Sequence, residues 1–161
     1  MKGGSEGMDH YWCYMDTPIG KLKIVGVQEG IISTSFTEED MLESKMITLE
    51  MERCRQQLRE YFRGKRKSFE LKLILEGTEK QFALWQAIYQ IPYGEMSGIR
   101  MLAYSAEDKR EKEVVIHDLC AHPFAVLVPC HRIIDDTEEL SLACGGEERK
   151  KWLMAFESEN I

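Results

Sequence analysis

A proline directly before a cysteine, at Pro129-Cys130, limits how the second half of this chain can fold. The residues before the proline, 124–128, form an apolar run that is typical of a buried strand. Proline has a fixed φ angle and no N–H group to donate to a strand ladder, so a strand has to end there. The sequence therefore predicts a buried strand over residues 124–128 that delivers Cys130 to a turn.

The two residues after the cysteine, His131 and Arg132, point to chemistry at the thiol. A cysteine attacks as the thiolate, and a nearby imidazole or positive charge favours that form. The alternative is a small buried cysteine beside a surface His-Arg pair, since a free cysteine is most often a core residue. These few residues alone do not decide between the two interpretations.

Length, charge and cysteine usage limit the class of protein. The 161 residues can bury one good core or two small ones, and no apolar run approaches the roughly 20 residues that span a bilayer. The five cysteines include no CxxC pair, which favours reduced thiols in the cytosol over a zinc knuckle or a secreted disulfide framework. No cofactor is expected, and no metal-ligand spacing is found. The net charge of −7 is unusual for a DNA-binding protein, although a local basic patch is compatible with it.

The first half of the chain has the pattern of a β-meander followed by a helix. Strands are predicted over residues 11–14, 21–25 and 31–36, because β-favouring residues there are separated by turn sequences. Apolar residues at helical spacing predict a helix over residues 42–62, which ends near Gly64. The opening residues 1–7 are polar and glycine-rich, so we expect a flexible tail or a cloning remnant, with Met8 as a candidate natural start.

The second half is predicted to be mainly helical. Thr78 is a suitable N-cap, and Gln81 completes a capping box three residues later, so a helix should begin there. Two further helical stretches are expected between residues 96 and 122, with a turn at 105–109. A polar turn follows at residues 135–139, and a last helix is expected over 147–157.

The Pro-Cys-His-Arg sequence after an apolar run resembles the active-site signature of the O6-alkylguanine-DNA alkyltransferases. Other parts of the chain are similar to the same family, and the similarity extends over about residues 11–157. The most specific matches are residues 77–95, with Gly77-Thr78, Phe82, Trp85 and Ile91-Pro92-Tyr93-Gly94-Glu95, and residues 124–134 around the cysteine. Further similar stretches are Thr17-Pro18-Ile19-Gly20, Leu58 to Gly64 and Gly145-Gly146 before the last helix.

The resemblance implies an α+β fold with two domains. Residues 8–76 would form an N-terminal ribonuclease-H-like domain, built from a β-meander and a helix. Residues 77–161 would form a C-terminal winged helix-turn-helix-like domain that carries the active-site cysteine. Proteins of this family act on double-stranded DNA that contains alkylated guanine. A monomer in the cytoplasm, or in the nucleus of a eukaryote, without membrane association is therefore expected.

The resemblance also implies a reaction. The family moves a methyl or alkyl group from oxygen-6 of guanine, or oxygen-4 of thymine, onto its own cysteine, once per molecule. By position, Cys130 is the alkyl acceptor, His131 the general base acting through a bound water, and Glu157 the group that orients the histidine. Without the resemblance, Glu157 would be interpreted as an exposed residue of the last helix.

Several substrate-binding positions carry unusual residues. In the family, backbone carbonyls of the cysteine and of the residue three positions later, here Ile133, contact the guanine amino group. The tyrosine beside the target nucleotide is replaced by Ile99, and the hinge asparagine by His122. Ala143 replaces a second pocket tyrosine, and Cys144 stands where serine is usual.

The DNA-binding positions depart further from the family. The arginine finger lies seventeen residues before the cysteine, and here that position is Glu113. A negative side chain is repelled by the phosphates, so an offset of three residues that makes Arg110 the finger is the alternative. Arg132, next to the active site, is a further candidate for DNA contact.

Two other functions remain open on the sequence alone. A divergent relative could keep the fold and a reactive thiol while losing efficient DNA binding and base flipping, because the finger and the tyrosine are missing. A cysteine hydrolase that uses Cys130, His131 and Glu157 is the third hypothesis, and it explains fewer of the matching residues.

Overall fold

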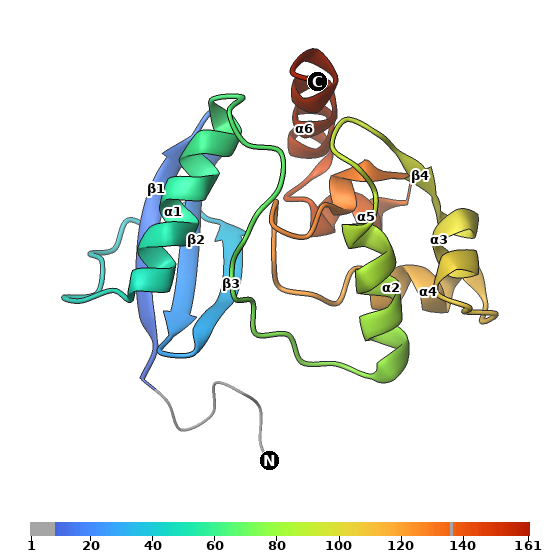
Figure 1. Cartoon of the computed structure of the whole chain (residues 1–161), viewed down its shortest axis with the longest axis horizontal. Helices are drawn as coiled ribbons and strands as arrows, with labels where there is room; N and C mark the ends of the chain where they lie inside the picture. The colour runs from blue at the N-terminus through green and yellow to red at the C-terminus, as the bar shows by residue number, and fades with distance from the viewer. Residues whose placement is uncertain (1–8, 136) are drawn as a thin grey trace. The chain divides into compact units, whose positions relative to one another are not determined.

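The computed structural model describes residues 9–135 and 137–161, which form two compact units of an α+β protein (Figure 1). One unit ends at Glu76 and the other begins at Gly77. The predicted tail, 1–7, and the candidate start Met8 lie outside the described residues. None of the helices in the described part of the chain has the length and apolar character of a membrane span.

A three-stranded antiparallel sheet forms the N-terminal unit, with β1 (Tyr11–Thr17), β2 (Gly20–Val27) and β3 (Gly30–Phe36) in sequence order. The predicted β-meander is confirmed. Alternate residues of β1 and β2, such as Cys13 and Leu22, are buried, which is the period-two pattern of a half-buried sheet.

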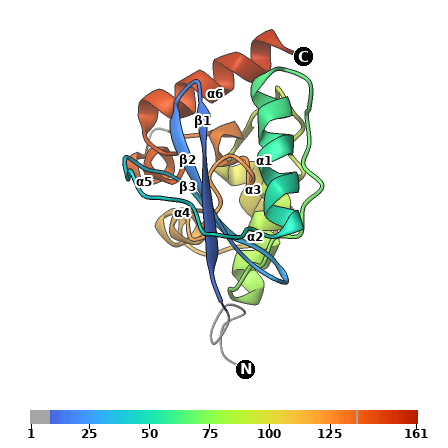
Figure 2. The same cartoon turned by 90° about the vertical axis from the view of Figure 1, so that its left-hand side faces the viewer.

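Helix α1 (Leu49–Phe62) packs against this sheet through Met51, Cys54 and Leu58 (Figure 2). The predicted start at residue 42 is wrong. The helix begins where the Thr48 hydroxyl accepts a hydrogen bond from the Met51 N–H at 3.1 Å. Leu42 is 90% exposed, so the apolar residues of this stretch do not belong to one buried face.

Three helices build the core of the C-terminal unit: α2 (Glu79–Tyr89), α3 (Ile99–Ser105) and α4 (Lys112–Leu119) (Figure 1). The Thr78 capping box is present as predicted. Trp85 on α2 donates its indole N–H to the carbonyl of Asp118 at 2.9 Å, which ties α2 to the end of α4. The pair of helices expected between residues 96 and 122 is confirmed, with residues 106–111 between them.

The predicted strand over residues 124–128 is wrong. These residues are buried, but they form a turn-rich loop in which Leu127 N–H donates to Ala125 O at 2.8 Å and Val126 has a φ of 69°. The N–H groups of Leu127 and Val128 donate to carbonyls two and four residues back, at Ala125 and Phe124, and the segment forms no extended ladder. An apolar run indicates burial, and here burial occurs without an extended strand.

The remaining elements surround the end of this loop. A 3-10 helix (Cys130–Arg132) leads into β5 (Ile133–Ile134), which pairs in parallel with β4 (Ser97–Gly98). The predicted polar turn covers residues 135–139. Helix α5 (Glu138–Ala143) begins inside this stretch and continues beyond it. Helix α6 (Glu147–Glu159) occupies the predicted place of the last helix.

Candidate active site

The Cys130 thiol lies at the start of the 3-10 helix, directly after Pro129. The prediction that this cysteine sits at a turn is confirmed. The residue is 1% exposed. Its sulfur lies 3.4 Å from the Cys144 sulfur and 3.7 Å from the Ala143 carbonyl oxygen, so the end of α5 forms one wall of the site.

The surroundings of Cys130 favour the neutral thiol. Contact with the Cys144 thiol and burial raise the pKa of Cys130 well above its usual range, and the imidazole of His122 acts in the opposite direction. A nucleophilic thiolate therefore needs both a proton acceptor and a group that stabilises the anion.

A buried cluster follows the cysteine in the chain. His131 Nε2 lies 2.7 Å from Glu157 Oε2. Arg132 donates from Nε to Glu157 Oε1 at 2.8 Å and from a terminal nitrogen to Glu157 Oε2 at 3.0 Å. The carboxylate thus binds the guanidinium with both oxygens and the imidazole with one, which is the geometry of a strong charge-assisted pair.

Burial lowers the pKa of His131, although Glu157 opposes this effect. Burial thus favours the neutral form of the ring. The short contact assigns the Nε2 proton to the bond with Glu157, and it leaves Nδ1 as the nitrogen that can accept a proton. A neutral imidazole with one nitrogen anchored to a carboxylate is the usual form of a general base.

Glu157 is buried, although its place in the last helix suggests an exposed residue. It is 1% exposed, on the inner face of α6. Its Oε1 also accepts the Gly94 N–H at 3.1 Å, so it connects α6 to the loop after α2. The Gly94 φ of 79° is a left-handed conformation that favours glycine. Sequence reasoning did not assign a role to Gly94, although it lies in the matching Ile-Pro-Tyr-Gly-Glu stretch.

Arg132, considered for DNA contact, is buried in the structure. Besides its two bonds to Glu157, the guanidinium donates to the Ile91 carbonyl at 2.8 Å and lies 5.6 Å from the centre of the Tyr93 ring. A buried guanidinium that makes three hydrogen bonds of this kind holds the cluster together.

Among the predicted substrate-binding residues, the structure brings His122 and Cys144 to Cys130. Ile133 is buried directly after the 3-10 helix, and its N–H donates to the Cys130 carbonyl. Ile99, at the start of α3, lines a depression of about 420 Å³ together with Arg110 and Lys112.

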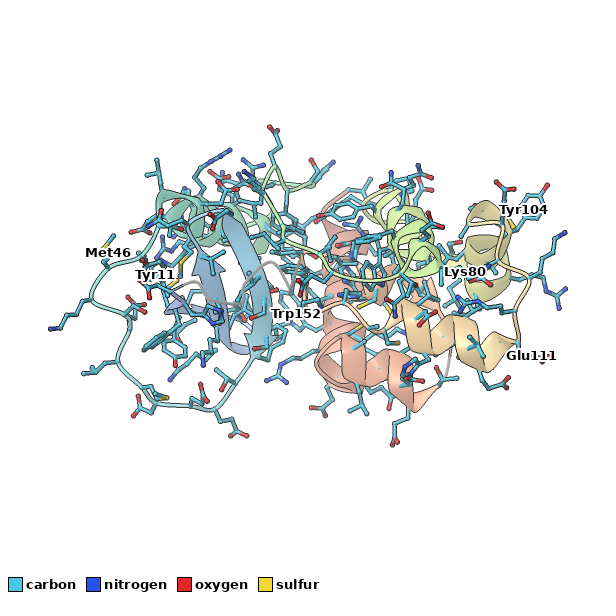
Figure 3. All side chains as sticks on the ribbon, turned by 90° about the horizontal axis from the view of Figure 1, so that it is seen from below. Tyr11, Met46, Lys80, Tyr104, Glu111 and Trp152 are labelled. Atoms are coloured by element: carbon cyan, nitrogen blue, oxygen red, sulfur yellow. The ribbon has the colours of Figure 1, made fainter. Side chains whose placement is uncertain are left out.

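The predicted DNA-binding residues of the helix pair have different surroundings. Arg110 forms ion pairs with Asp108 at 2.7 Å and with Asp118 at 2.9 Å. Glu113, at the finger position, is exposed on the first turn of α4. Tyr104 is 79% exposed and projects from α3 (Figure 3). The charge of Arg110 is thus balanced within the protein, which argues against its use as a finger.

A buried cysteine followed directly by an imidazole–carboxylate pair is the arrangement of proteins that use a cysteine as nucleophile with a histidine as base. Two family profiles match the chain. They are the 6-O-methylguanine DNA methyltransferase ribonuclease-like domain, over residues 10–75, and the 6-O-methylguanine DNA methyltransferase DNA-binding domain, over residues 79–159. The chain belongs to this family.

Curated relatives and solved structures agree with the family profiles. A methylated-DNA–protein-cysteine methyltransferase of Methanosarcina barkeri is 32% identical over 94% of this chain and 99% of its own. The constitutive enzyme of that name from Bacillus subtilis is 31% identical over 92% of this chain and 95% of its own. The Mycobacterium tuberculosis O6-methylguanine methyltransferase structure has a TM-score of 0.80 at 27% identity and covers 95% of each chain. The protein of the same organism in complex with DNA has a TM-score of 0.77 at 28% identity, covering 93% of this chain and 94% of that one.

Proposed function

We propose that this protein repairs DNA by direct and irreversible transfer of a methyl or alkyl group from oxygen-6 of guanine to the sulfur of Cys130. The observation that carries the proposal is the buried Cys130 thiol, followed directly by His131 with its Nε2 2.7 Å from Glu157. Alkylated oxygen-4 of thymine is proposed as a second substrate on the same chemical grounds. Each molecule reacts once, because the thioether formed on the cysteine has no easy route back to a thiol.

The reaction balances as a displacement at the alkyl carbon. The Cys130 thiol loses its proton, and the thiolate forms a bond to that carbon while the bond to the guanine oxygen breaks. The electron pair of the broken bond stays with guanine, which takes up a proton as it leaves. A thiolate suits this step because sulfur is strongly nucleophilic.

His131 is proposed to accept the thiol proton at Nδ1 through a bound water, while its Nε2 proton remains on the bond to Glu157. Glu157 orients the ring and stabilises the imidazolium that forms. Arg132 acts one step further away, because it holds the carboxylate in place with two hydrogen bonds. It is a positioning residue, since it touches neither the thiol nor the base.

The substrate base would be recognised mainly by backbone groups. We propose that the carbonyls of Cys130 and Ile133 accept hydrogen bonds from the guanine amino group. The Cys130 carbonyl already accepts the Ile133 N–H, and a carbonyl oxygen has a second lone pair for the substrate. Cys144 would line the same pocket beside the transferred alkyl group.

DNA is the partner of this reaction, and the helix pair of the C-terminal unit is proposed to bind it. The protein is proposed to act as a monomer in the cytoplasm. Recognition of alkylated guanine in a duplex requires the base to leave the stack, which costs a few kcal/mol. Exposed cations such as Arg100 and Lys109 would contact phosphates. The units ending at Glu76 and starting at Gly77 are proposed to be the two domains.

The ion pairs of Arg110 bear on the alternative function, which the family match does not favour. A protein with Glu113 at the finger position and Arg110 held by carboxylates would keep a reactive thiol while flipping bases poorly. It would then react with a free alkylated base but not with a duplex.

Intact-mass measurement separates these functions. The protein is incubated with a duplex oligonucleotide that contains methylguanine and, separately, with free benzylguanine. Repair predicts one methyl from the duplex and one benzyl from the free base, both on Cys130. Cys130→Ala should abolish both labels, while Cys54→Ala, which removes a buried cysteine of α1, should retain them. Labelling by the free base alone would establish the alternative function, and labelling of Cys130→Ala would exclude Cys130 as the acceptor.

A further inference from the structure

Two cysteines at the active site form a close pair of sulfurs. The Cys144 thiol donates to the Cys130 sulfur, and the two sulfurs lie 3.4 Å apart. Cys130 begins the 3-10 helix, whereas Cys144 directly follows α5, so the pair joins two separate elements. Both are free thiols and almost fully buried, with 1% of Cys130 and 2% of Cys144 exposed. The proposed transfer uses one of these thiols and assigns no reaction to the other.

The distance between the sulfurs is short enough for a bond to form with little rearrangement. A disulfide has a sulfur–sulfur length of about 2.05 Å, so the two atoms have to approach by about 1.4 Å. Gly146, two residues after Cys144, has a left-handed φ of 109°. A side-chain carbon added there would meet none of the described residues within 4 Å, its chain neighbours aside. The chain just after Cys144 therefore has space in which to adjust.

Cys120, at the end of α4, is a nearby thiol with different surroundings. It is half-buried, and its sulfur donates to the Glu139 carbonyl at 3.6 Å. Burial and, to a smaller extent, charge interaction with Cys130 raise the pKa of the Cys120 thiol. Cys120 is thus near enough to compete for Cys130, and it supplies a matched control for the closer contact with Cys144.

We infer that Cys144 is a resolving cysteine: after a peroxide oxidises Cys130, Cys144 closes a reversible disulfide with it and protects the acceptor thiol from permanent loss. The consequence for repair rests on the proposed role of Cys130 as alkyl acceptor. A protein that reacts once per molecule is lost to repair when its cysteine reaches the sulfinic acid, because thiols do not reduce that form. A disulfide is reduced by thiols, so the molecule is kept.

The chemistry balances in two steps. The Cys130 thiolate attacks one oxygen of hydrogen peroxide, the O–O bond breaks, and the leaving hydroxide takes up the thiol proton as water. The sulfur is then a sulfenic acid, oxidised by two electrons, and the peroxide is reduced. The Cys144 sulfur attacks the Cys130 sulfur, and the S–O bond breaks. The second hydroxide takes up the Cys144 proton, so two thiols and one peroxide give a disulfide and two waters.

The active site already supplies what the first step needs. Alkyl transfer requires a Cys130 thiolate, and the same thiolate is the form that attacks peroxide. His131, the proposed proton acceptor, therefore serves both reactions. A site that admits a guanine base to this sulfur also admits peroxide, which is far smaller. The family that the sequence resembles usually has serine at the position of Cys144, and a hydroxyl cannot close this bond.

Four proteins test the inference: the native chain, Cys144→Ser, Cys144→Ala and Cys120→Ser. Each is treated with hydrogen peroxide, with and without dimedone, a carbon nucleophile that traps sulfenic acids. Intact mass and peptide mapping identify the products, and a thiol reductant is then added. Benzyl transfer from free benzylguanine after reduction is compared with each protein's own untreated rate. Thermal melting checks that the variants are folded.

The native protein should lose two hydrogens, and its digest should contain a linked Cys130–Cys144 peptide pair. The reductant should return benzyl transfer to within about twofold of the untreated rate. Under the same exposure, both Cys144 variants should be trapped by dimedone at Cys130 and, without dimedone, gain two oxygens there. Their benzyl transfer should stay about tenfold below the untreated rate after reduction. Cys120→Ser should behave as the native protein does.

A native protein whose Cys130 gains oxygens without a link to Cys144 would overturn the inference, and so would full recovery of a Cys144 variant. The first of these results needs only the native chain, so it stands even if the variants fail to fold. Peptide mapping detects the disulfide whether or not the protein accepts alkylguanine. An untreated native protein that takes no benzyl or methyl group would end the repair proposal, while a reversible link would still support the sulfur chemistry. Normal benzyl transfer without such a link would leave repair intact and refute the role of Cys144.

Discussion

Replacing Glu157 with glutamine should strongly destabilise the C-terminal unit, because it leaves the Arg132 guanidinium buried without a counter-charge. Both side chains of the pair are almost fully enclosed, with 2% of Glu157 and 10% of Arg132 exposed. Water therefore screens the pair very little. Removing one partner of such a pair costs about 3–5 kcal/mol, whereas removing an exposed pair costs about 0–1 kcal/mol.

The hydrogen bonds of the cluster give an independent magnitude. Glu157 accepts bonds of 2.7, 2.8 and 3.0 Å from His131 and Arg132. The carboxylate also accepts the Gly94 N–H at 3.1 Å, so each of its oxygens accepts two bonds. A glutamine has one acceptor oxygen, so it keeps two of these four bonds and loses two. At about 1.5–3 kcal/mol for each bond to a charged group, the loss is about 3–6 kcal/mol, in agreement with the ion-pair value.

Urea denaturation followed by tryptophan fluorescence measures this loss. A Trp12→Phe background confines the signal to Trp85 and Trp152 of the C-terminal unit. Glu159→Gln, on an exposed position of the same helix, is the matched control and should change stability by less than about 0.5 kcal/mol.

A double-mutant cycle with Arg132→Gln completes the test. The double variant should lose less than the sum of the two single variants, because the second substitution removes the charge that the first leaves unpaired. A loss below about 1 kcal/mol for Glu157→Gln, or strict additivity in the cycle, would refute the cluster as a buried ion pair.

Three further predictions concern single contacts. Thr78→Ala should lower the free energy of unfolding by about 1 kcal/mol in urea denaturation, because the capping box of α2 is lost. The Arg110 guanidinium holds the pKa of Asp108 below its usual range. This carboxylate therefore stabilises the protein above about pH 4 and loses that contribution as the pH falls further, so Asp108→Asn should flatten the acid side of a stability–pH curve. Diamide, which accepts two electrons and two protons from a pair of thiols, should join Cys130 and Cys144, whose sulfurs lie 3.4 Å apart. Intact mass should show the loss of two hydrogens, a thiol reductant should reverse it, and Cys144→Ser should prevent it.

Local sequence rules predicted the features that depend on short spacing. The Thr78–Gln81 capping box and the three strands of the meander are present, because caps and turns are determined by neighbours in the chain. The start of α1 could not be found in this way. Leu42 continues the helical spacing but is exposed, and periodicity alone does not tell which apolar residues reach a core.

The loop over residues 124–128 shows a second limit of pattern reasoning. Its apolar residues are buried as expected, but the backbone turns at Val126 with a φ of 69°. A β-branched residue is rare in that conformation, so no local rule could indicate the turn. The apolar composition of a segment indicates that its residues are buried. The path of its backbone depends on the elements packed around it.

The candidate site was partly visible in the sequence. The adjacency of Cys130 and His131 marks the nucleophile, whereas Glu157 lies 26 residues from its partner and is recognisable only by resemblance. Arg132 was considered for DNA contact, because a charged residue beside an active site is usually expected at the surface, but the residue is buried. Its burial depends on Glu157, which the last helix brings to it.

The positions of two arginines explain how the active-site chemistry and the DNA-binding surface can change independently of each other. Arg132 forms an ion pair with Glu157 inside the site. Arg110, which lies between α3 and α4, forms ion pairs with Asp108 and Asp118. The charge of each guanidinium is thus balanced by carboxylates of the protein. We expect the attraction to DNA to come mainly from exposed side chains such as Arg100. Because Cys130 and His131 are buried, we expect substitutions of exposed residues to alter the affinity for DNA while the reactivity of Cys130 persists.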